Sequence, residues 1–393
     1  MIMKPEIKIS SATLVSALGC GIDATLKSLL EFKSGLKPQN YSQVDFETYL
    51  GEVKELKSYQ IDDDYKKSDC RNNRLTQLCL NTDNFKQKVE GIKQKYGSDN
   101  IPLFLATSTS GITTTEQAYQ NNSKNDNYQN THQFFSLAKF VSSYLNINSH
   151  MSLISTACSS SAKAVVSAME YIQAGLSDVA IVGVCDSLCL TTIYGFHSLG
   201  LLSAQKCAPW DENRGGTSLG EAAAFLILEK CDDNDKNKEI IKIKGFGESV
   251  DGFHMSTPHP DALGAKLAIN SALDNAGLSA CDVDYINLHG TATAINDKTE
   301  DLAIKNIFSN DTMASSTKGG SGHTLAASGI VELIICMLSI QNNMAFGTMN
   351  TTKIDKELSA NIILKNTPAA INTTLSNSFG FGGNNCCLIL GSS

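Results

Sequence analysis

Short apolar runs alternate with longer stretches of helical periodicity along most of the chain. Ile101–Ala106 and Val179–Val184 are continuously apolar, which is typical of strands that are buried on both faces of a sheet. Ser160–Gln173 carries its apolar residues at helical spacing, and Gly175 follows as a helix stop. Because strands and helices alternate, the pattern predicts an α/β fold with largely buried sheets.

The same order of strands and helices recurs in the second part of the chain. Ala265–Ala276 is predicted to be a helix that stops at Gly277, and Tyr285–His289 is predicted to be a strand. Leu325–Gln341 is a long apolar stretch of helical character with small residues near its start. This repetition indicates two halves of similar construction.

A polar segment at residues 231–239 separates these halves. It lacks apolar spacing and falls between two strand-like runs, Ala224–Glu229 and Ile240–Gly245. We therefore place the boundary there and predict two halves, residues 1–238 and 239–393.

The composition is that of a folded protein with a large core. Of the 393 residues, 42% are hydrophobic and 18% are charged, which excludes a disordered or fibrous chain. The formal net charge is −8, so we expect no general attraction to nucleic acid or to an anionic membrane surface. No window approaches the roughly 18 uninterrupted apolar residues of a membrane helix. We therefore expect a cytoplasmic protein without a membrane partner.

Cys158 is the cysteine whose position most suggests chemistry. The chain has twelve cysteines and no CxxC pair, so we expect reduced thiols. Cys158 lies between a short apolar run and the start of a helix that Ser159 or Ser160 is predicted to cap. A thiol there faces unpaired backbone N–H groups and the positive end of the helix dipole, which favour the nucleophilic thiolate. The alternative is a buried small side chain with no chemical role.

Two of the seven histidines lie in glycine-rich segments, which another part of the chain or a ligand can approach closely. They are His289, in Leu288–Thr293, and His323, in Lys318–Ala327. Either one alone could be an ordinary structural histidine, but together with Cys158 they suggest one site. No third His, Asp or Glu stands at a ligand spacing, so we expect no metal ion.

The segment Asn377–Asn385 combines three glycines with Phe379 and Phe381. A tight turn before a last strand at Cys387–Leu390 is one explanation. The functional alternative is a hinge-like gate over a pocket.

Four segments, in this order, resemble the β-ketoacyl-[acyl-carrier-protein] synthases of the KAS I/II type, which are elongating condensing enzymes. They are Thr156–Ser160, His289–Thr293, Lys318 with Gly322–His323, and Ser376–Gly383. Order and spacing agree over essentially the whole chain. The resemblance implies a thiolase-like fold, in which two similar α/β halves, each with a five-stranded sheet, stack as α-β-α-β-α layers. It also implies a homodimer.

The resemblance further implies a three-step reaction. Cys158 would take an acyl group from the phosphopantetheine arm of acyl carrier protein. Malonyl-carrier protein would then lose carbon dioxide, and its carbanion would attack the acyl-cysteine to give a β-ketoacyl product two carbons longer. No separate cofactor is expected, because the substrates carry the phosphopantetheine.

Roles for individual residues follow from the same resemblance. His289 and His323 would donate N–H groups to the enolate oxygen, while the backbone N–H groups of Cys158 and Phe381 would stabilise the oxyanion of acyl transfer. The remaining matches are Lys318, Glu300 and Asp297 as a charged network behind the histidines, Thr291 and Thr293 at the pantetheine amides, Phe381 with Phe379 at the gate, and Ile112 at the acyl tunnel near the dimer contact.

Basic residues that could dock the acidic carrier protein are few. Lys66, Lys67, Arg71 and Arg74 form the densest cluster, and Lys206 could join them. They lie near the carrier-docking region of the family. An ordinary solvated helix face explains the cluster equally well.

The chain departs from the housekeeping pattern in places. Arg214–Thr217 reads Arg-Gly-Gly-Thr where the family usually has Arg-Asp-Gly-Phe. Ser108–Ile112 and Cys185–Cys189 look more like synthases of aryl-polyene-type secondary pathways, in which a chain-length-factor-like partner could replace one subunit of the dimer. Fatty acid biosynthesis stays a close rival to such a pathway. Two other functions stay open: a thiolase-fold acyltransferase acting on coenzyme A esters, and a non-catalytic partner subunit. The presence of Cys158 with both histidines opposes the last.

Overall fold

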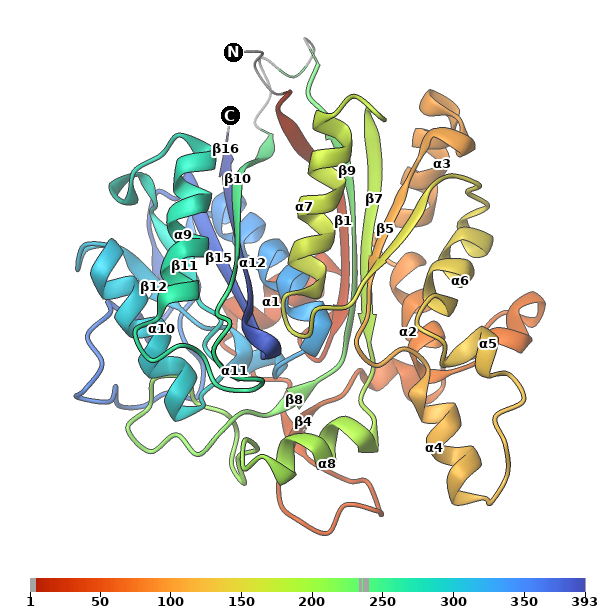
Figure 1. Cartoon of the computed structure of the whole chain (residues 1–393), viewed down its shortest axis with the longest axis horizontal. Helices are drawn as coiled ribbons and strands as arrows, with labels where there is room; N and C mark the ends of the chain where they lie inside the picture. The colour runs from red at the N-terminus through yellow and green to blue at the C-terminus, as the bar shows by residue number, and fades with distance from the viewer. Residues whose placement is uncertain (1–4, 233–234, 236–239, 393) are drawn as a thin grey trace.

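The apolar runs predicted as strands form the centres of two sheets in a computed structural model, which describes residues 5–232, 235 and 240–392 (Figure 1). In the first half the strand order is β1 (Ile7–Ser16), β9 (Ala222–Lys230), β7 (Val179–Asp186), β5 (Leu103–Ala106) and β6 (Met151–Ile154). In the second half it is β12 (Met313–Ser315), β11 (Tyr285–Asn287), β15 (Thr373–Gly380), β16 (Asn384–Ser392) and β10 (Ile241–Val250). The predicted α/β class is confirmed.

The two sheets meet along one edge. β1 pairs antiparallel with β10 through Ile7 opposite Ile243 and Lys8 opposite Lys242. This short seam makes them one continuous ladder in the described part of the chain. Small additional strands are β2 (Gly19–Cys20), β3 (Lys37–Pro38), β4 (Tyr49–Gly51), β8 (Leu219–Gly220), β13 (Met344–Ala345) and β14 (Thr367–Pro368).

Helices fill the space between the sheets and cover their outer faces. α7 (Ser160–Gln173) and α12 (Ser328–Asn342) lie in the middle, α2 (Arg71–Leu80), α3 (Phe85–Tyr96) and α6 (Ser136–Leu145) cover the first sheet, and α9 (Leu263–Ala276) and α10 (Ala294–Ile307) cover the second (Figure 1). The predicted α-β-α-β-α order is therefore confirmed. The remaining helices are α1 (Ile22–Leu30), α4 (Ile112–Gln120), α5 (Tyr128–Thr131), α8 (Leu190–Ser198) and α11 (Lys318–Ser321).

The predicted strand at Tyr285–His289 is shorter than expected. It ends at Asn287, because the chain leaves the sheet at Gly290, whose φ of 43° lies in the left-handed region that glycine adopts most easily. His289 is thereby placed on a turn beyond the end of the strand, not within the ladder. The predicted boundary between residues 238 and 239 lies outside the described residues.

The central helix α12 has an unusual composition for a core element. Leu325–Asn342, the short 3₁₀ turn Leu325–Ala327 together with α12, has a mean hydropathy of 1.6 and is long and apolar enough to cross a membrane. Ser328, Glu332 and Ser339 interrupt the stretch, so it is not the uninterrupted apolar window whose absence was expected. Moreover, 89% of the stretch is buried inside the protein, as expected for the core helix of a layered fold.

Candidate active site

Cys158 lies on a tight turn between β6 and α7, and it is 5% exposed. The preceding Ala157 has a φ of 53°, a strained conformation for a residue with a side chain. The hydroxyls of Ser159 and Ser160 donate hydrogen bonds to the carbonyls of Thr156 (2.9 Å) and Ala157 (2.5 Å). The predicted cap was wrong: neither side chain caps α7, and both instead hold the turn that presents the thiol.

The Cys158 thiol is protonated at neutral pH. Burial raises its pKa to about 11, although the charge of Lys318 and the backbone N–H of Phe381 act in the opposite direction. The expected thiolate is therefore wrong for the resting protein, because desolvation outweighs the end of the helix. A thiol in this state needs a base beside it, and Nε2 of His323 lies 3.0 Å from Sγ.

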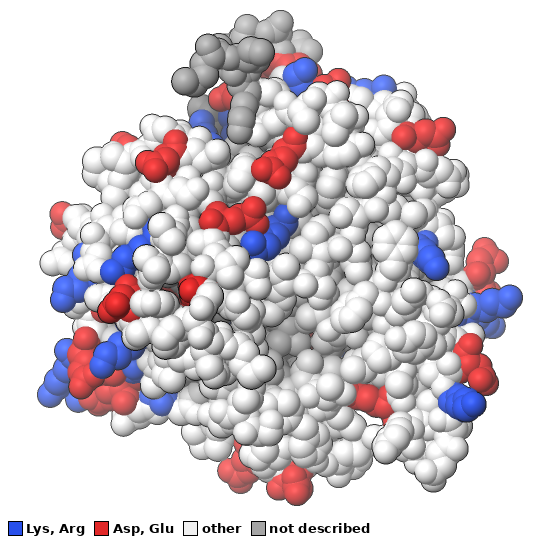
Figure 2. Space-filling view, viewed as in Figure 1, with Lys and Arg blue, Asp and Glu red and all other residues white. Residues whose placement is uncertain are grey.

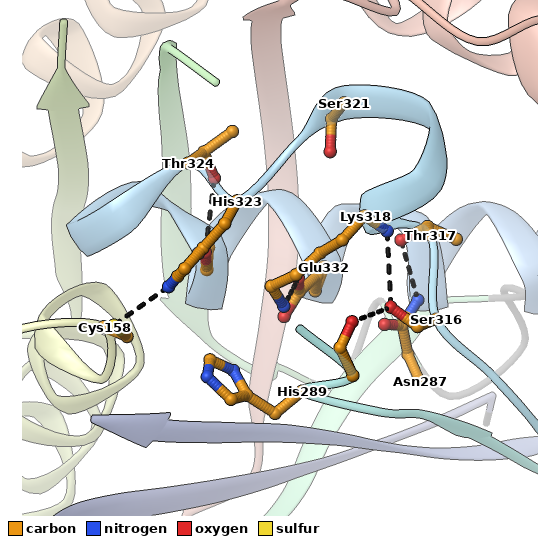
Figure 3. A network of polar contacts seen from close by, with 12 residues as sticks. Cys158, Asn287, His289, Ser316, Thr317, Lys318, Ser321, His323, Thr324 and Glu332 are labelled. Carbon is orange, nitrogen blue, oxygen red and sulfur yellow. Dashed lines mark hydrogen bonds and ion pairs between the residues drawn. The ribbon is translucent and has the colours of Figure 1, made fainter. Parts of the chain in front are cut away.

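His289 and His323 approach Cys158 from the second half of the chain (Figure 3). Their ring centroids are 5.3 Å apart with an interplanar angle of 87°, and a ligand atom from each of the three residues lies within 4.8 Å of the others. Burial, followed by the charge of Lys318, lowers the pKa of both imidazoles well below 6.5. Both rings are therefore neutral at pH 7, and each has one N–H to donate.

An ion pair between Lys318 and Glu332 lies directly behind the two rings (Figure 3). Both side chains are buried, and burial raises the pKa of Glu332 to about 7 despite the neighbouring ammonium. The prediction that Lys318 is networked with Glu300 was wrong, because Lys318 binds a residue of α12. The sequence does carry a signal for it, since Glu332 is the one charged residue in the sequence of that helix.

Glu300 holds the turn that carries His289. Its carboxylate accepts hydrogen bonds from the backbone N–H groups of His289 and Gly290, both at 2.8 Å, and from the amide of Asn377 at 3.0 Å. Burial raises the pKa of Glu300 to about 7 in spite of these bonds. Asp297, one helical turn earlier on α10, accepts from the N–H of Ala292 at 3.2 Å and braces the same turn.

A cavity of about 460 Å³ opens over Cys158 and both histidines. Thr291, Thr293, Phe379 and Phe381 line it, as the resemblance implies, and the two threonine hydroxyls are 2.9 Å apart. On the face shown in Figure 2, the surface is hollowed where α7 begins, and the atoms around the hollow are uncharged. Arg214 and Asp251 are the charged side chains among the lining residues, and the rest of the wall is apolar or neutral, which suits an arm that carries an acyl group.

Phe196 of α8 is a lining residue that the sequence analysis missed. Its ring stacks on Phe381 with centroids 5.5 Å apart and lies edge-on to His323 at 6.3 Å. The adjacent Gly380 lets this segment lie close to the turn that carries Cys158, because a Cβ there would lie 2.9 Å from the carbonyl oxygen of Thr156. No sequence pattern marked α8 as part of the site.

Several predicted residues do not lie at this cavity. Ile112 begins α4 and is not among the lining residues, so its role at an acyl tunnel stays a prediction. Arg71 and Arg74 line a separate hollow of about 240 Å³. Lys66 and Lys67 are exposed on the 3₁₀ turn Asp63–Ser68, and Lys206 is half-buried in the loop after α8.

Arg71 is an internal ion-pair partner and not a free docking group. Its guanidinium donates to both carboxylate oxygens of the buried Glu221, at 2.8 and 2.6 Å. Arg74 is paired with Asp69 in the same bidentate way. A partner 150 positions away therefore neutralises Arg71, and a role of Arg71 in carrier docking stays a prediction.

Cys158, His289 and His323 are also the one group in the described part of the chain whose spacing suits a metal ion. A sulfur and two imidazole nitrogens are ligands that zinc accepts. The buried ammonium of Lys318, which lowers the pKa of both imidazoles, opposes a divalent cation at this position. The absence of a resident metal stays a prediction, and activity after dialysis against a chelator tests it.

Two family models match the chain. The model described as "Beta-ketoacyl synthase, N-terminal domain" matches residues 6–234, and "Beta-ketoacyl synthase, C-terminal domain" matches residues 240–352. A 3-oxoacyl-[acyl-carrier-protein] synthase 2 of Staphylococcus aureus (strain COL) is 28% identical over 411 residues, 99% of each chain.

Solved structures agree with the family models. A chain from the complex of a ketosynthase with its chain length factor from Xenorhabdus doucetiae is 34% identical, with a TM-score of 0.91 over 99% of this chain and 98% of that chain. A chain from a complex of a type II polyketide acyl-carrier protein with its ketosynthase shares the fold, at 22% identity and a TM-score of 0.84 over 99% of each chain.

Proposed function

The chain belongs to the β-ketoacyl synthase family, and from this we propose that it elongates acyl groups on a carrier protein with Cys158 as nucleophile. Members of this family are decarboxylating condensing acyltransferases. One observation carries the assignment of roles: a protonated thiol and two neutral imidazoles meet within 4.8 Å over a single cavity. Each step of the condensation has a group there that suits it.

In the acyl-transfer step, His323 acts as the base. Its Nε2, 3.0 Å from Sγ, takes the thiol proton as the sulfur attacks the thioester carbonyl of the acyl-carrier substrate. The backbone N–H groups of Cys158 and Phe381 stabilise the oxyanion that develops. The carbon–sulfur bond to the carrier arm breaks, and the proton on Nε2 passes to the departing thiol.

In the decarboxylation step, the malonyl thioester oxygen lies between the two rings. His289 and His323 each donate one N–H to it, so that the enolate forms as the carboxylate leaves as carbon dioxide. The enolate carbon attacks the acyl carbonyl on Cys158, and the sulfur leaves. Loss of either histidine is expected to cost about 10²–10³ in rate. Burial, followed by the charge of Lys318, keeps both rings neutral, and Glu332 allows that cation to be buried.

The substrate arm enters past Phe381. The hydroxyls of Thr291 and Thr293 on the cavity wall suit the amides of a pantetheine arm, and Phe379 and Phe381 close the wall around the acyl group. Lys66 and Lys67 are the exposed cations offered to the carrier protein, with Lys206 as a third candidate. The arm belongs to the substrate, so no separate cofactor is needed.

The proposed pathway is a polyene or polyketide type rather than primary fatty-acid synthesis. Identity to a chain of the ketosynthase–chain length factor complex is 34% over nearly the whole chain, against 28% for the staphylococcal synthase. The proposed assembly is accordingly a dimer in the cytoplasm, with a chain-length-factor-like subunit in place of a second copy.

Reconstitution tests this function. The purified chain, alone and with a co-expressed chain-length-factor-like subunit, is incubated with holo-carrier protein, malonyl-carrier and a panel of acyl primers, and products are read by mass spectrometry. We expect β-ketoacyl-carrier products that disappear in Cys158→Ala and persist in Cys281→Ala, an exposed cysteine. Condensation that survives Cys158→Ala would overturn the proposal. Acylation of Cys158 from coenzyme A esters but not from carrier protein would favour the acyltransferase alternative.

A further inference from the structure

Ser328, the first residue of α12, contacts the far side of the His323 ring. Its buried hydroxyl lies 2.9 Å from Nδ1 of His323, while Nε2 of the same ring lies 3.0 Å from Sγ of Cys158. The only other side chain within hydrogen-bond distance of this hydroxyl in the described part of the chain is that of Thr324, at 3.4 Å. The ring is thus held between a thiol and a hydroxyl.

Acyl transfer and decarboxylation, the two half-reactions, require the hydrogen of the neutral His323 ring to be on different nitrogens. A neutral imidazole has one N–H, so one nitrogen donates and the other accepts. In acyl transfer Nε2 must accept the thiol proton, and Nδ1 then carries hydrogen and needs an acceptor. In decarboxylation Nε2 must donate to the enolate oxygen, and Nδ1 then needs a donor.

A hydroxyl can meet both needs by rotating about its C–O bond, whereas a backbone N–H can only donate and a carbonyl can only accept. We propose that Ser328 is a positioning residue that stabilises His323 in both of the hydrogen placements that the two half-reactions require. This inference rests on the proposed roles of Cys158 and His323. The charged or titratable groups that act on the ring or on the thiol beside it are Lys318, Glu332, Asp186, His289 and Cys158 itself.

The two half-reactions should respond unequally to loss of the hydroxyl. During acyl transfer His323 becomes an imidazolium, and its Nδ1–H donates to Ser328 in a charge-assisted bond. During decarboxylation the bond joins two neutral groups. Ser328→Ala is therefore expected to slow single-turnover acylation of Cys158 roughly 10- to 100-fold, and decarboxylation of malonyl-carrier about 3- to 10-fold.

Two variants serve as controls. Ser339→Ala removes another buried hydroxyl from the same helix, far from the histidines, and should match the parent in both rates. Ser328→Thr retains a hydroxyl and should recover most of the acylation rate. If Ser328→Ala matches Ser339→Ala, or if Ser328→Thr loses as much acylation as Ser328→Ala, the inference is wrong.

The pH dependence of Cys158 alkylation by iodoacetamide, read by peptide mass mapping, separates positioning from general damage to the fold. At neutral pH the thiol and the ring are both uncharged at rest, and alkylation requires the proton to pass from Sγ to Nε2 of His323. Loss of the Ser328 oxygen, which stabilises the resulting imidazolium, should therefore slow alkylation at neutral pH more than at a pH near 11, where the thiolate forms without the ring. A merely structural defect should slow alkylation to the same degree at both pH values.

The ¹⁵N resonances of the His323 ring give a readout independent of activity. They are assigned by their absence in His323→Asn, and in Ser328→Ala they should shift toward a different mixture of the two tautomers. Unchanged resonances would overturn the inference while leaving the proposed function intact. The proposed function fails separately, if condensation survives Cys158→Ala.

Discussion

The carboxylate of Asp186 accepts a 2.9 Å hydrogen bond from the backbone N–H of Ala326, although 140 positions separate the two residues. Asp186 ends β7 in the first half, and Ala326 lies between His323 and α12 in the second. Ser161, in the first turn of α7, donates to the carbonyl of the same Ala326 at 2.5 Å. Residues of the first half therefore bind both the N–H and the carbonyl of Ala326. This contact holds the segment that carries His323 close to Cys158.

Asp186→Asn is expected to loosen this contact between the halves. The carboxylate also accepts from the N–H groups of Ser108 (2.7 Å) and Thr109 (2.9 Å), and an amide would turn an NH₂ group toward these donors. We expect the free energy of unfolding to fall by about 2–4 kcal/mol, with a loss of elongation rate. Urea unfolding and turnover measure the two effects. The exposed Asp274→Asn is the control and should change neither.

Lys318→Met should move the pH profile of decarboxylation. Lys318 lowers the pKa of both histidines, so its removal raises their pKa values and leaves them protonated at higher pH. The acid limb of malonyl decarboxylation, measured in a Cys158→Gln background that mimics an acylated cysteine, should shift to higher pH, although burial still holds both pKa values down. Lys298→Met on α10, which is exposed, should leave the limb in place. An unchanged limb in Lys318→Met would contradict the electrostatic role.

The stability contributed by Glu300 and Glu332 should fall as the pH rises from 5 to 8, while the two buried histidines, whose pKa values are lowered, add stability as the pH rises toward 6.5. Burial raises the folded-state pKa of Glu300 and Glu332 from 4.5 to about 7. A carboxyl whose pKa is higher in the folded protein contributes stability that is fully present below pH 4.5 and is lost as the pH passes through 7. Each contributes about 2–4 kcal/mol to this fall. Urea unfolding across this range should show that the stability of the parent falls relative to that of Glu332→Gln, and a difference between the two proteins that does not change with pH would refute the assignment.

Phe381→Ala should shorten the life of the acyl-enzyme. The substitution removes the ring that stacks on Phe196 and opens the cavity over Cys158 to water. We expect hydrolysis of acyl-Cys158 to accelerate on the order of 10-fold, as followed by intact-protein mass spectrometry. Phe253→Ala, a more exposed aromatic, is the matched control. Equal lifetimes in both variants would exclude a sealing role for Phe381.

Substitutions in the basic cluster should distinguish residues that dock the carrier protein from residues that form internal ion pairs. Lys67→Glu, at an exposed site, should raise KM for the carrier protein about 3- to 10-fold at low salt, with a smaller effect at high salt. Arg71→Met should instead lower the free energy of unfolding by about 3–5 kcal/mol, because Glu221 is left buried and unpaired. If Arg71→Met raised KM for the carrier protein and Lys67→Glu left it unchanged, Arg71 would be a docking residue.

The elements of the fold could be predicted because their apolar periodicity is strong. The helix Ser160–Gln173 has the predicted ends, and Leu263–Ala276 starts two residues earlier than predicted and ends before Gly277 as expected. Cys158, His289 and His323 could be grouped because each lies in a distinctive local segment. Their convergence depends on the stacking of two halves, which no local pattern encodes.

The sequence could not predict which carboxylates pair with the buried cations, because tertiary packing determines these contacts. Lys318 pairs with Glu332 rather than Glu300, and Arg71 pairs with Glu221, because the layers bring those carboxylates into contact. The pKa of Cys158 was misjudged for a similar reason. The end of the helix is a local feature, whereas the burial that outweighs it comes from the entire surrounding structure.

The apolar character of α12 has a consequence for how the protein is made. The helix is complete at Asn342, yet β15 and β16, which cover one side of it, are finished only at Ser392. A nascent chain leaving the ribosome therefore displays a stretch that would suit a lipid bilayer until the final strands emerge. Truncation within those strands should yield a chaperone-bound or aggregated product, and not a shortened enzyme.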